Sequence, residues 1–104
     1  MGINYGDLMK QARVMQKQLE LVQEELKNTV FEASSGGGVV KVKVNGNQEL
    51  LEVKINKEVV DTDDMEMLED MVMVAINDAL TQSKNEYKSK MGSLTGGMNI
   101  PGLF

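Results

Sequence analysis

The chain has 104 residues, of which 41% are hydrophobic and 26% are charged, and its formal net charge is −5. This composition is typical of a soluble globular protein. The length fits one domain, and so small a domain gains stability from a partner subunit because much of its surface stays in water. No run approaches the roughly 18 to 20 apolar residues of a membrane span, and the N-terminus lacks the apolar run of a signal peptide. We therefore expect a cytoplasmic protein that does not engage a membrane.

Cysteine and histidine are both absent from the chain. The absence of cysteine excludes disulfides and thiolate metal ligands. The absence of histidine removes the side chain that most often performs acid–base catalysis near neutral pH. We therefore expect no enzymatic activity, no cofactor, no metal ion and no small-molecule substrate.

The first predicted element is an amphipathic helix over residues 5–28. Its apolar positions recur in alternating steps of four and three residues, which is typical of a helix that packs in the manner of a coiled coil. These positions are Leu8, Ala12, Met15, Leu19, Val22 and Leu26.

Alternation with a period of two follows this helix and predicts three strands, within residues 30–33, 40–44 and 51–55. The joints between them, at residues 36–38 and 45–47, are short and rich in residues that tolerate positive φ. Such joints predict a three-stranded antiparallel meander.

A second long helix is predicted over residues 63–91, with an acidic cluster at residues 61–64 that can cap its N-terminus. The closing residues, 92–104, hold four of the ten glycines and the one proline, and this predicts a flexible tail with a few apolar residues able to dock. The expected fold is α+β, in the order α-β-β-β-α, as one domain over residues 1–91 followed by the tail.

The two helices outrun the short strands, so each must overhang the sheet. Within the second helix, the segment MVMVAI is apolar on every side. A small sheet can bury only one side of it, so the other sides require a further packing partner. We therefore expect a homodimer related by a two-fold axis. Two alternatives are a compact monomer core and a methionine-rich peptide groove. The expected dimer interface consists of Met71, Val72, Met73, Val74 and Ile76.

Charge is distributed unevenly along the chain. Residues 20–78 carry five lysines against fourteen carboxylates, whereas residues 1–19 and 79–104 each carry three basic residues against one carboxylate. In the expected fold, the start of the first helix and the end of the second can lie side by side as a basic tip on an acidic body. Such tips would contact the phosphates of double-stranded DNA. Alternatively, they are solvated helix faces. The residues of the expected DNA-binding site are Lys10, Arg13, Lys17, Lys84, Lys88 and Lys90.

Four stretches together resemble the YbaB/EbfC family of nucleoid-associated proteins: LMKQARVMQKQLELVQEEL, SSGGGVVKVKVNGNQELLEVKI, MEMLEDMVMVAINDAL and TGGMNIPGLF. The resemblance covers nearly the whole chain. It implies an intertwined or tightly packed homodimer, shaped like tweezers, whose helical arms bind DNA in the bacterial nucleoid, with a role in nucleoid organisation and gene regulation. The family's DNA contacts map to the arm regions, which hold the six basic residues named above.

Two further motifs favour a structural role. The triple glycine at residues 36–38 lacks the lysine of a phosphate-binding loop and precedes a strand, so it is interpreted as a hairpin joint. The acidic group at residues 61–66 lacks the spacing of a calcium loop and is interpreted as a helix cap. A dimeric adaptor that clasps another protein, without significant DNA binding, is the alternative function.

Overall fold

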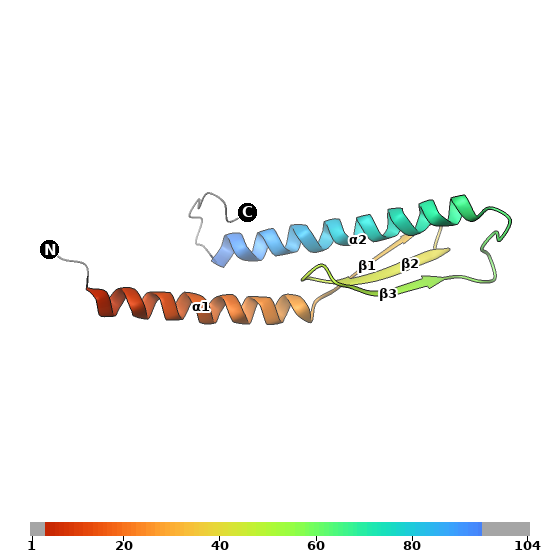
Figure 1. The fold of residues 1–104 in the computed structure, drawn as a ribbon. Helices are drawn as coiled ribbons and strands as arrows, with labels where there is room; N and C mark the ends of the chain where they lie inside the picture. The colour runs from red at the N-terminus through yellow and green to blue at the C-terminus, as the bar shows by residue number, and fades with distance from the viewer. Residues whose placement is uncertain (1–3, 95–104) are drawn as a thin grey trace.

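The computed structural model describes residues 4–94, which form two long helices and a three-stranded sheet (Figure 1). This confirms the expected α-β-β-β-α fold and its antiparallel sheet. The elements in chain order are α1 (Tyr5–Lys27), β1 (Val30–Ser35), β2 (Val40–Asn45), β3 (Leu50–Ile55) and α2 (Met65–Leu94).

The helix α1 has defined caps at both ends. The Asn4 side chain accepts a hydrogen bond from the backbone amide of Gly6 at 2.9 Å, which is the N-cap role expected of asparagine. At the other end, the Asn28 amide bonds back to the carbonyls of Glu24 and Glu25. The helix therefore ends one residue before the predicted boundary.

The sheet has the order β1-β2-β3, and both pairings are antiparallel. The glycines of the β1–β2 joint all have positive φ, between 62° and 100°, as the sequence predicts for a tight joint. In the central strand, Val40, Val42 and Val44 are fully buried or nearly so. They form the floor of the core.

The helix α2 packs across β1 and β2 and covers this floor. Ala75 and Ala79 are completely buried against the valines of β2, because small side chains let the helix approach the sheet closely. Asp64 caps the helix by accepting a hydrogen bond from the amide of Met67 at 3.0 Å. An acidic cap was predicted here from the sequence.

The bounds of α2 differ slightly from the predicted 63–91. The helix begins two residues later and continues to Leu94, so residues 92–94 of the expected tail are helical. The remainder of that tail, residues 95–104, lies outside the described residues.

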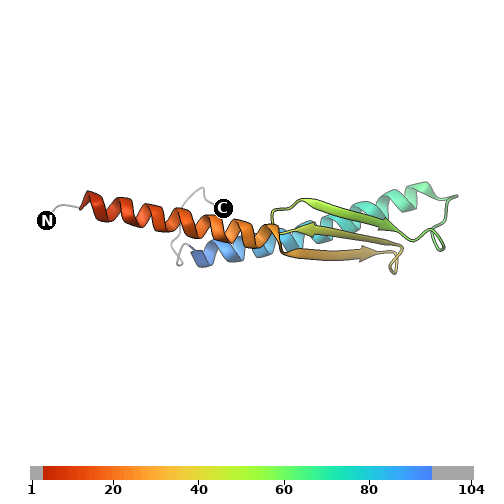
Figure 2. The ribbon, with the colours of Figure 1, turned by 90° about the horizontal axis from the view of Figure 1, so that it is seen from below.

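The protomer is elongated, with extents of 74 × 23 × 15 Å. In Figures 1 and 2, α1 continues the line of the sheet, and α2 lies over the sheet and then over the C-terminal half of α1. Neither of these two helices is long and apolar enough to cross a membrane, within residues 4–94.

Candidate nucleic-acid interface

The first half of α1 projects beyond the other described elements, the sheet and α2. The last residues of α2, Ser93 and Leu94, line a hollow together with Gln18 and Leu21 of α1, so α2 ends beside the middle of α1. This differs from the expectation that the end of the second helix lies beside the start of the first. The reason is the length of the helices. About 20 Å of α2 lies over the sheet, and the part of α2 that extends beyond the sheet is shorter than α1.

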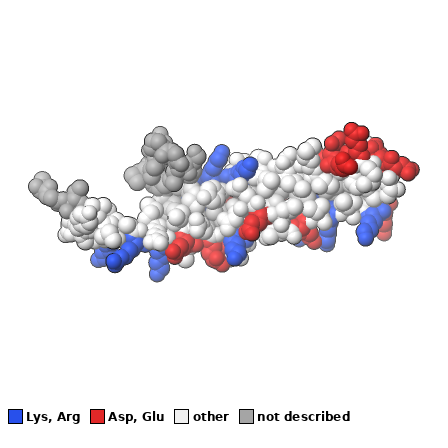
Figure 3. All heavy atoms as spheres, in the orientation of Figure 1, with Lys and Arg blue, Asp and Glu red and all other residues white. Residues whose placement is uncertain are grey.

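Three basic residues lie along this projecting arm. Lys10, Arg13 and Lys17 are all exposed, and their spacing of three and four residues places them on one face of the helix. That face is about half a turn away from the apolar stripe of Leu8 and Met15. In Figure 3, basic side chains gather on the side of α1 that faces away from α2. The arm thus presents a basic face to solvent.

The three lysines of α2 have different surroundings. Lys84 and Lys88 are exposed and lie four residues apart on one face of the helix. The Lys90 ammonium instead donates a hydrogen bond to Glu25 Oε1 of α1 at 2.7 Å. This hydrogen bond, with the negative charge of Glu25, raises the pKa of Lys90 above 10.5. Lys90 therefore joins the two helices.

Carboxylates gather at the opposite end of the molecule, around the start of α2, as Figure 3 shows. This acidic end consists of Asp61, Asp63, Asp64, Glu66, Glu69 and Asp70. The charge of the protomer is thus separated along its length. An anionic partner is attracted to the arm and repelled from the acidic end.

The residues of the expected dimer interface divide into two groups. Met71, Val72 and Ile76 pack against the core of their own protomer. Met73 and Val74 remain 56% and 49% exposed. The segment is apolar on every side, yet only part of it is free for a second subunit, because the other part covers the sheet.

The sequence reasoning missed a second exposed apolar surface, on β3. Val53 and Ile55 stand directly opposite the buried Val42 and Val40, so they point to the face of the sheet that α2 covers. They are nevertheless 40% and 37% exposed, because α2 lies across β1 and β2. A sheet about 14 Å wide exceeds a helix about 10 Å across, and this comparison could have revealed that one strand stays uncovered, although not which one.

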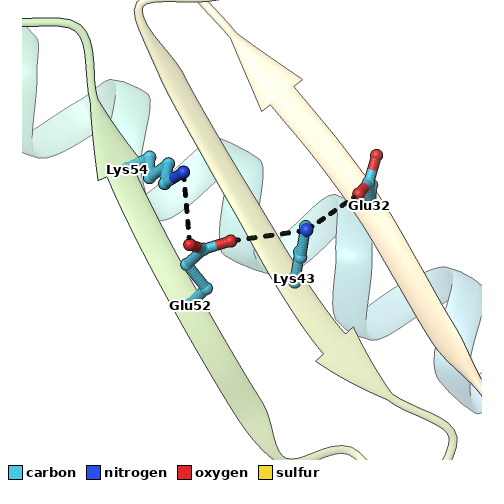
Figure 4. A network of polar contacts seen from close by, with 4 residues as sticks. All are labelled: Glu32, Lys43, Glu52 and Lys54. Atoms are coloured by element: carbon cyan, nitrogen blue, oxygen red, sulfur yellow. Dashed lines mark ion pairs between the residues drawn. The ribbon is translucent and has the colours of Figure 1, made fainter.

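The other face of the sheet is polar and carries a chain of ion pairs (Figure 4). The Lys43 ammonium lies 3.4 Å from Glu32 and 3.6 Å from Glu52, and Lys54 lies 3.6 Å from the other oxygen of Glu52. The hydrogen bond to Glu32 and the charge of Glu52 raise the pKa of Lys43. In the part of the chain that the structure describes, no three acidic residues are grouped as metal ligands.

The chain is similar to known proteins over nearly its whole length. Residues 1–98 match the YbaB/EbfC DNA-binding family. A nucleoid-associated protein of Desulforamulus reducens is 51% identical over 104 residues, covering 100% of this chain and 99% of its own. A nucleoid-associated protein of Clostridium novyi is 50% identical over 103 residues, covering 99% of this chain and 90% of its own. The crystal structure of an uncharacterized protein from Helicobacter pylori matches the fold with a TM-score of 0.83 at 26% identity, covering 91% of this chain and 100% of that one.

Proposed function

Because the chain belongs to the YbaB/EbfC DNA-binding family, we propose that it is a nucleoid-associated protein that binds duplex DNA as a homodimer through phosphate contacts. The observation that carries this proposal is the exposed basic face of the projecting α1 arm, formed by Lys10, Arg13 and Lys17. Bacterial relatives about half identical to it are named nucleoid-associated proteins. The family is not an enzyme family, and the proposed role is architectural, with consequences for nucleoid organisation and gene regulation.

Phosphate contact fits the chemistry of the arm. Lysine and arginine bind phosphate oxygens through charge-assisted hydrogen bonds, and each contact releases counterions from the duplex. The arm carries one arginine and two lysines, so there is little capacity for the paired hydrogen bonds that read base edges. We expect weakly sequence-specific binding, with a dissociation constant on the order of 10⁻⁴ to 10⁻⁶ M for one arm at physiological salt.

The lysines of α2 contribute unequally to this proposal. Lys84 and Lys88 are exposed and add two further phosphate contacts. Lys90 forms an ion pair with Glu25 that joins α2 to α1. Its charge also adds to the positive electrostatic potential near the arm.

The homodimer is supported by the apolar surface that a single protomer leaves exposed. Val53 and Ile55 of β3, with Met73 and Val74 of α2, would be removed from water in a dimer. A dimer carries two arms, and simultaneous attachment of both raises the overall affinity well above that of one arm. Because the proposed ligand is chromosomal DNA, we expect the protein in the cytoplasm at the nucleoid.

An adaptor that clasps another protein is the second candidate, favoured by the acidic end and the exposed methionines of α2.

Fluorescence anisotropy of a labelled duplex at low salt distinguishes the two candidates. We expect the K10Q/R13Q/K17Q variant to bind at least tenfold more weakly, because removal of each phosphate-binding charge lowers the affinity. Lys27→Gln removes an exposed charge outside the arm and serves as the control. Absence of binding by the wild type at low salt would leave the adaptor as the better account, whereas equal affinities of the wild type and the arm variant would show that DNA binds elsewhere on the protein.

A further inference from the structure

The outer face of the sheet, which points away from α2, holds two neighbouring cross-strand rows of different charge pattern. One row runs Glu32, Lys43, Glu52, so that opposite charges face each other on adjacent strands. The next row runs Ser34, Lys41, Lys54, so that two lysines stand directly opposite each other. Like charges in this position destabilise a sheet.

The lysines of the second row have too few neighbouring carboxylates to neutralise their charge. Lys54 has one carboxylate, Glu52, and Lys43 shares it. Lys41 is exposed and makes no ion pair within residues 4–94. The outer face of the sheet therefore has an unneutralised positive charge at the row of Lys41 and Lys54.

A hollow of about 530 Å³ lies over this face, and its lining includes all three residues of this row together with Glu32, Lys43 and Glu52 of the first row. We propose that Ser34, Lys41 and Lys54 form a binding site for a phosphate group. In this site the two ammonium groups flank the anion and the Ser34 hydroxyl donates a hydrogen bond to it. A bound phosphate attracts both lysines and also offsets the repulsion between them. Both effects favour binding.

The phosphate group has two possible sources, free phosphate and the backbone of a duplex. The site lies on the side of the protomer that faces away from α2, which is also the side of the basic face of α1 (Figures 2 and 3). A duplex lying along this side would reach both. The DNA source rests on the proposed function, whereas binding of free phosphate does not depend on it.

The test uses backbone amide NMR shifts of the full-length protein during titration with inorganic phosphate at constant ionic strength. The wild type should show saturable shifts at Ser34, Lys41 and Lys54, with a dissociation constant on the order of 1 mM. The K41Q/K54Q variant should bind at least tenfold more weakly and should still fold, because the substitutions remove a repulsion. K27Q/K57Q, which also removes two exposed lysine charges, is the control for the change in net charge.

Two results would overturn the site: no saturable shift in the wild type, or equal shifts in the wild type and K41Q/K54Q. A second titration, with a short duplex, identifies the source. It is performed on wild type and on K10Q/R13Q/K17Q, so that loss of arm binding is seen separately from loss at the sheet. Once inorganic phosphate has given saturable shifts, further shifts at Ser34 and Lys41 with the duplex assign the site to DNA phosphates, and their absence with the duplex assigns it to free phosphate. Either result supports the site itself.

Discussion

The backbone amide of Gly46 donates a hydrogen bond to the carbonyl of Leu26 at 2.7 Å, and thereby joins the β2–β3 turn to the last turn of α1. The preceding residue in that turn, Asn45, accepts a hydrogen bond from Ser83 Oγ of α2, also at 2.7 Å. One turn of the sheet thus holds both helices. The direction in which the α1 arm projects is fixed at this joint, about 25 Å from the far end of its basic face.

Substitution of Gly46 tests this joint. A Cβ at position 46 would lie 2.6 Å from the Leu26 carbonyl oxygen and 2.8 Å from Leu26 Cδ2, so the backbone of α1 must move. We expect Gly46→Ala to lower the free energy of unfolding by about 1 to 3 kcal/mol, measured by chemical denaturation. Gly92→Ala is the control, because among the described residues a Cβ there meets no atom within 4 Å beyond its chain neighbours and its own helix backbone. Equal stability of Gly46→Ala and wild type would show that the close approach is not a constraint.

The buried hydroxyl of Ser83 provides a second test of the same joint. Its side chain is completely buried and its hydrogen bond to Asn45 O crosses from α2 to the sheet. Ser83→Ala should lower the free energy of unfolding by about 1 kcal/mol, because the Asn45 carbonyl loses one of its two donors and keeps only the backbone amide of Gln48. Ser89→Ala, at an exposed position of the same helix, should change it by less than about 0.5 kcal/mol. A Ser83→Ala variant as stable as Ser89→Ala would contradict the role of this hydrogen bond.

The proposed dimer surface on β3 predicts the effect of a charge at position 53. Val53→Lys places an ammonium on the apolar surface that two protomers would bury, and its desolvation opposes association. We expect this variant to be a folded monomer by light scattering and circular dichroism, since Val53 is already 40% exposed in the protomer. Val59→Lys changes an exposed valine in the loop after β3 and should remain dimeric. If Val53→Lys has the mass of the wild-type dimer, the β3 surface is not the interface.

The Lys90–Glu25 ion pair predicts a pH dependence of stability. The folded-state pKa of Lys90 is raised above its ordinary value of 10.5 by the hydrogen bond to Glu25. The pair therefore stabilises the protein fully below pH 10.5, and this effect disappears as the pH rises through the folded-state pKa. The melting temperature of wild type should exceed that of Lys90→Gln by a small margin at pH 8, and the margin should vanish at higher pH. A difference in melting temperature that stays constant across this range would contradict the stabilising role of the Lys90–Glu25 pair. Lys43 titrates in both the wild type and Lys90→Gln, so its contribution drops out of the difference between them.

Periodicity in the sequence was sufficient to predict the fold. The stripe from Leu8 to Leu26 and the alternation of Val40, Val42 and Val44 are local patterns, and they predicted α1 and β2 to within a residue or two. The acidic cap of α2 was predicted for the same reason, since Asp64 acts on the next turn of its own helix.

The arrangement of the helices and the strands at the site could not be predicted in the same way. The sequence does not show that Lys90 meets Glu25, because the two residues lie 65 positions apart and their meeting depends on the path of α2. It also does not show that α2 covers β1 and β2, because Val53 alternates with polar residues just as Val42 does. Tertiary placement decides which of these equivalent patterns is buried.

The measurement that tests the central claim most directly is the salt dependence of duplex binding by wild type and K10Q/R13Q/K17Q. If the arm holds DNA by phosphate contacts, log Kd rises linearly with log salt concentration for the wild type. The slope for the variant should be smaller by about 0.9 for each phosphate that the arm no longer neutralises, and Lys27→Gln should keep the wild-type slope. Equal slopes for the wild type and the arm variant would contradict the claim that the basic face of α1 binds the phosphate backbone.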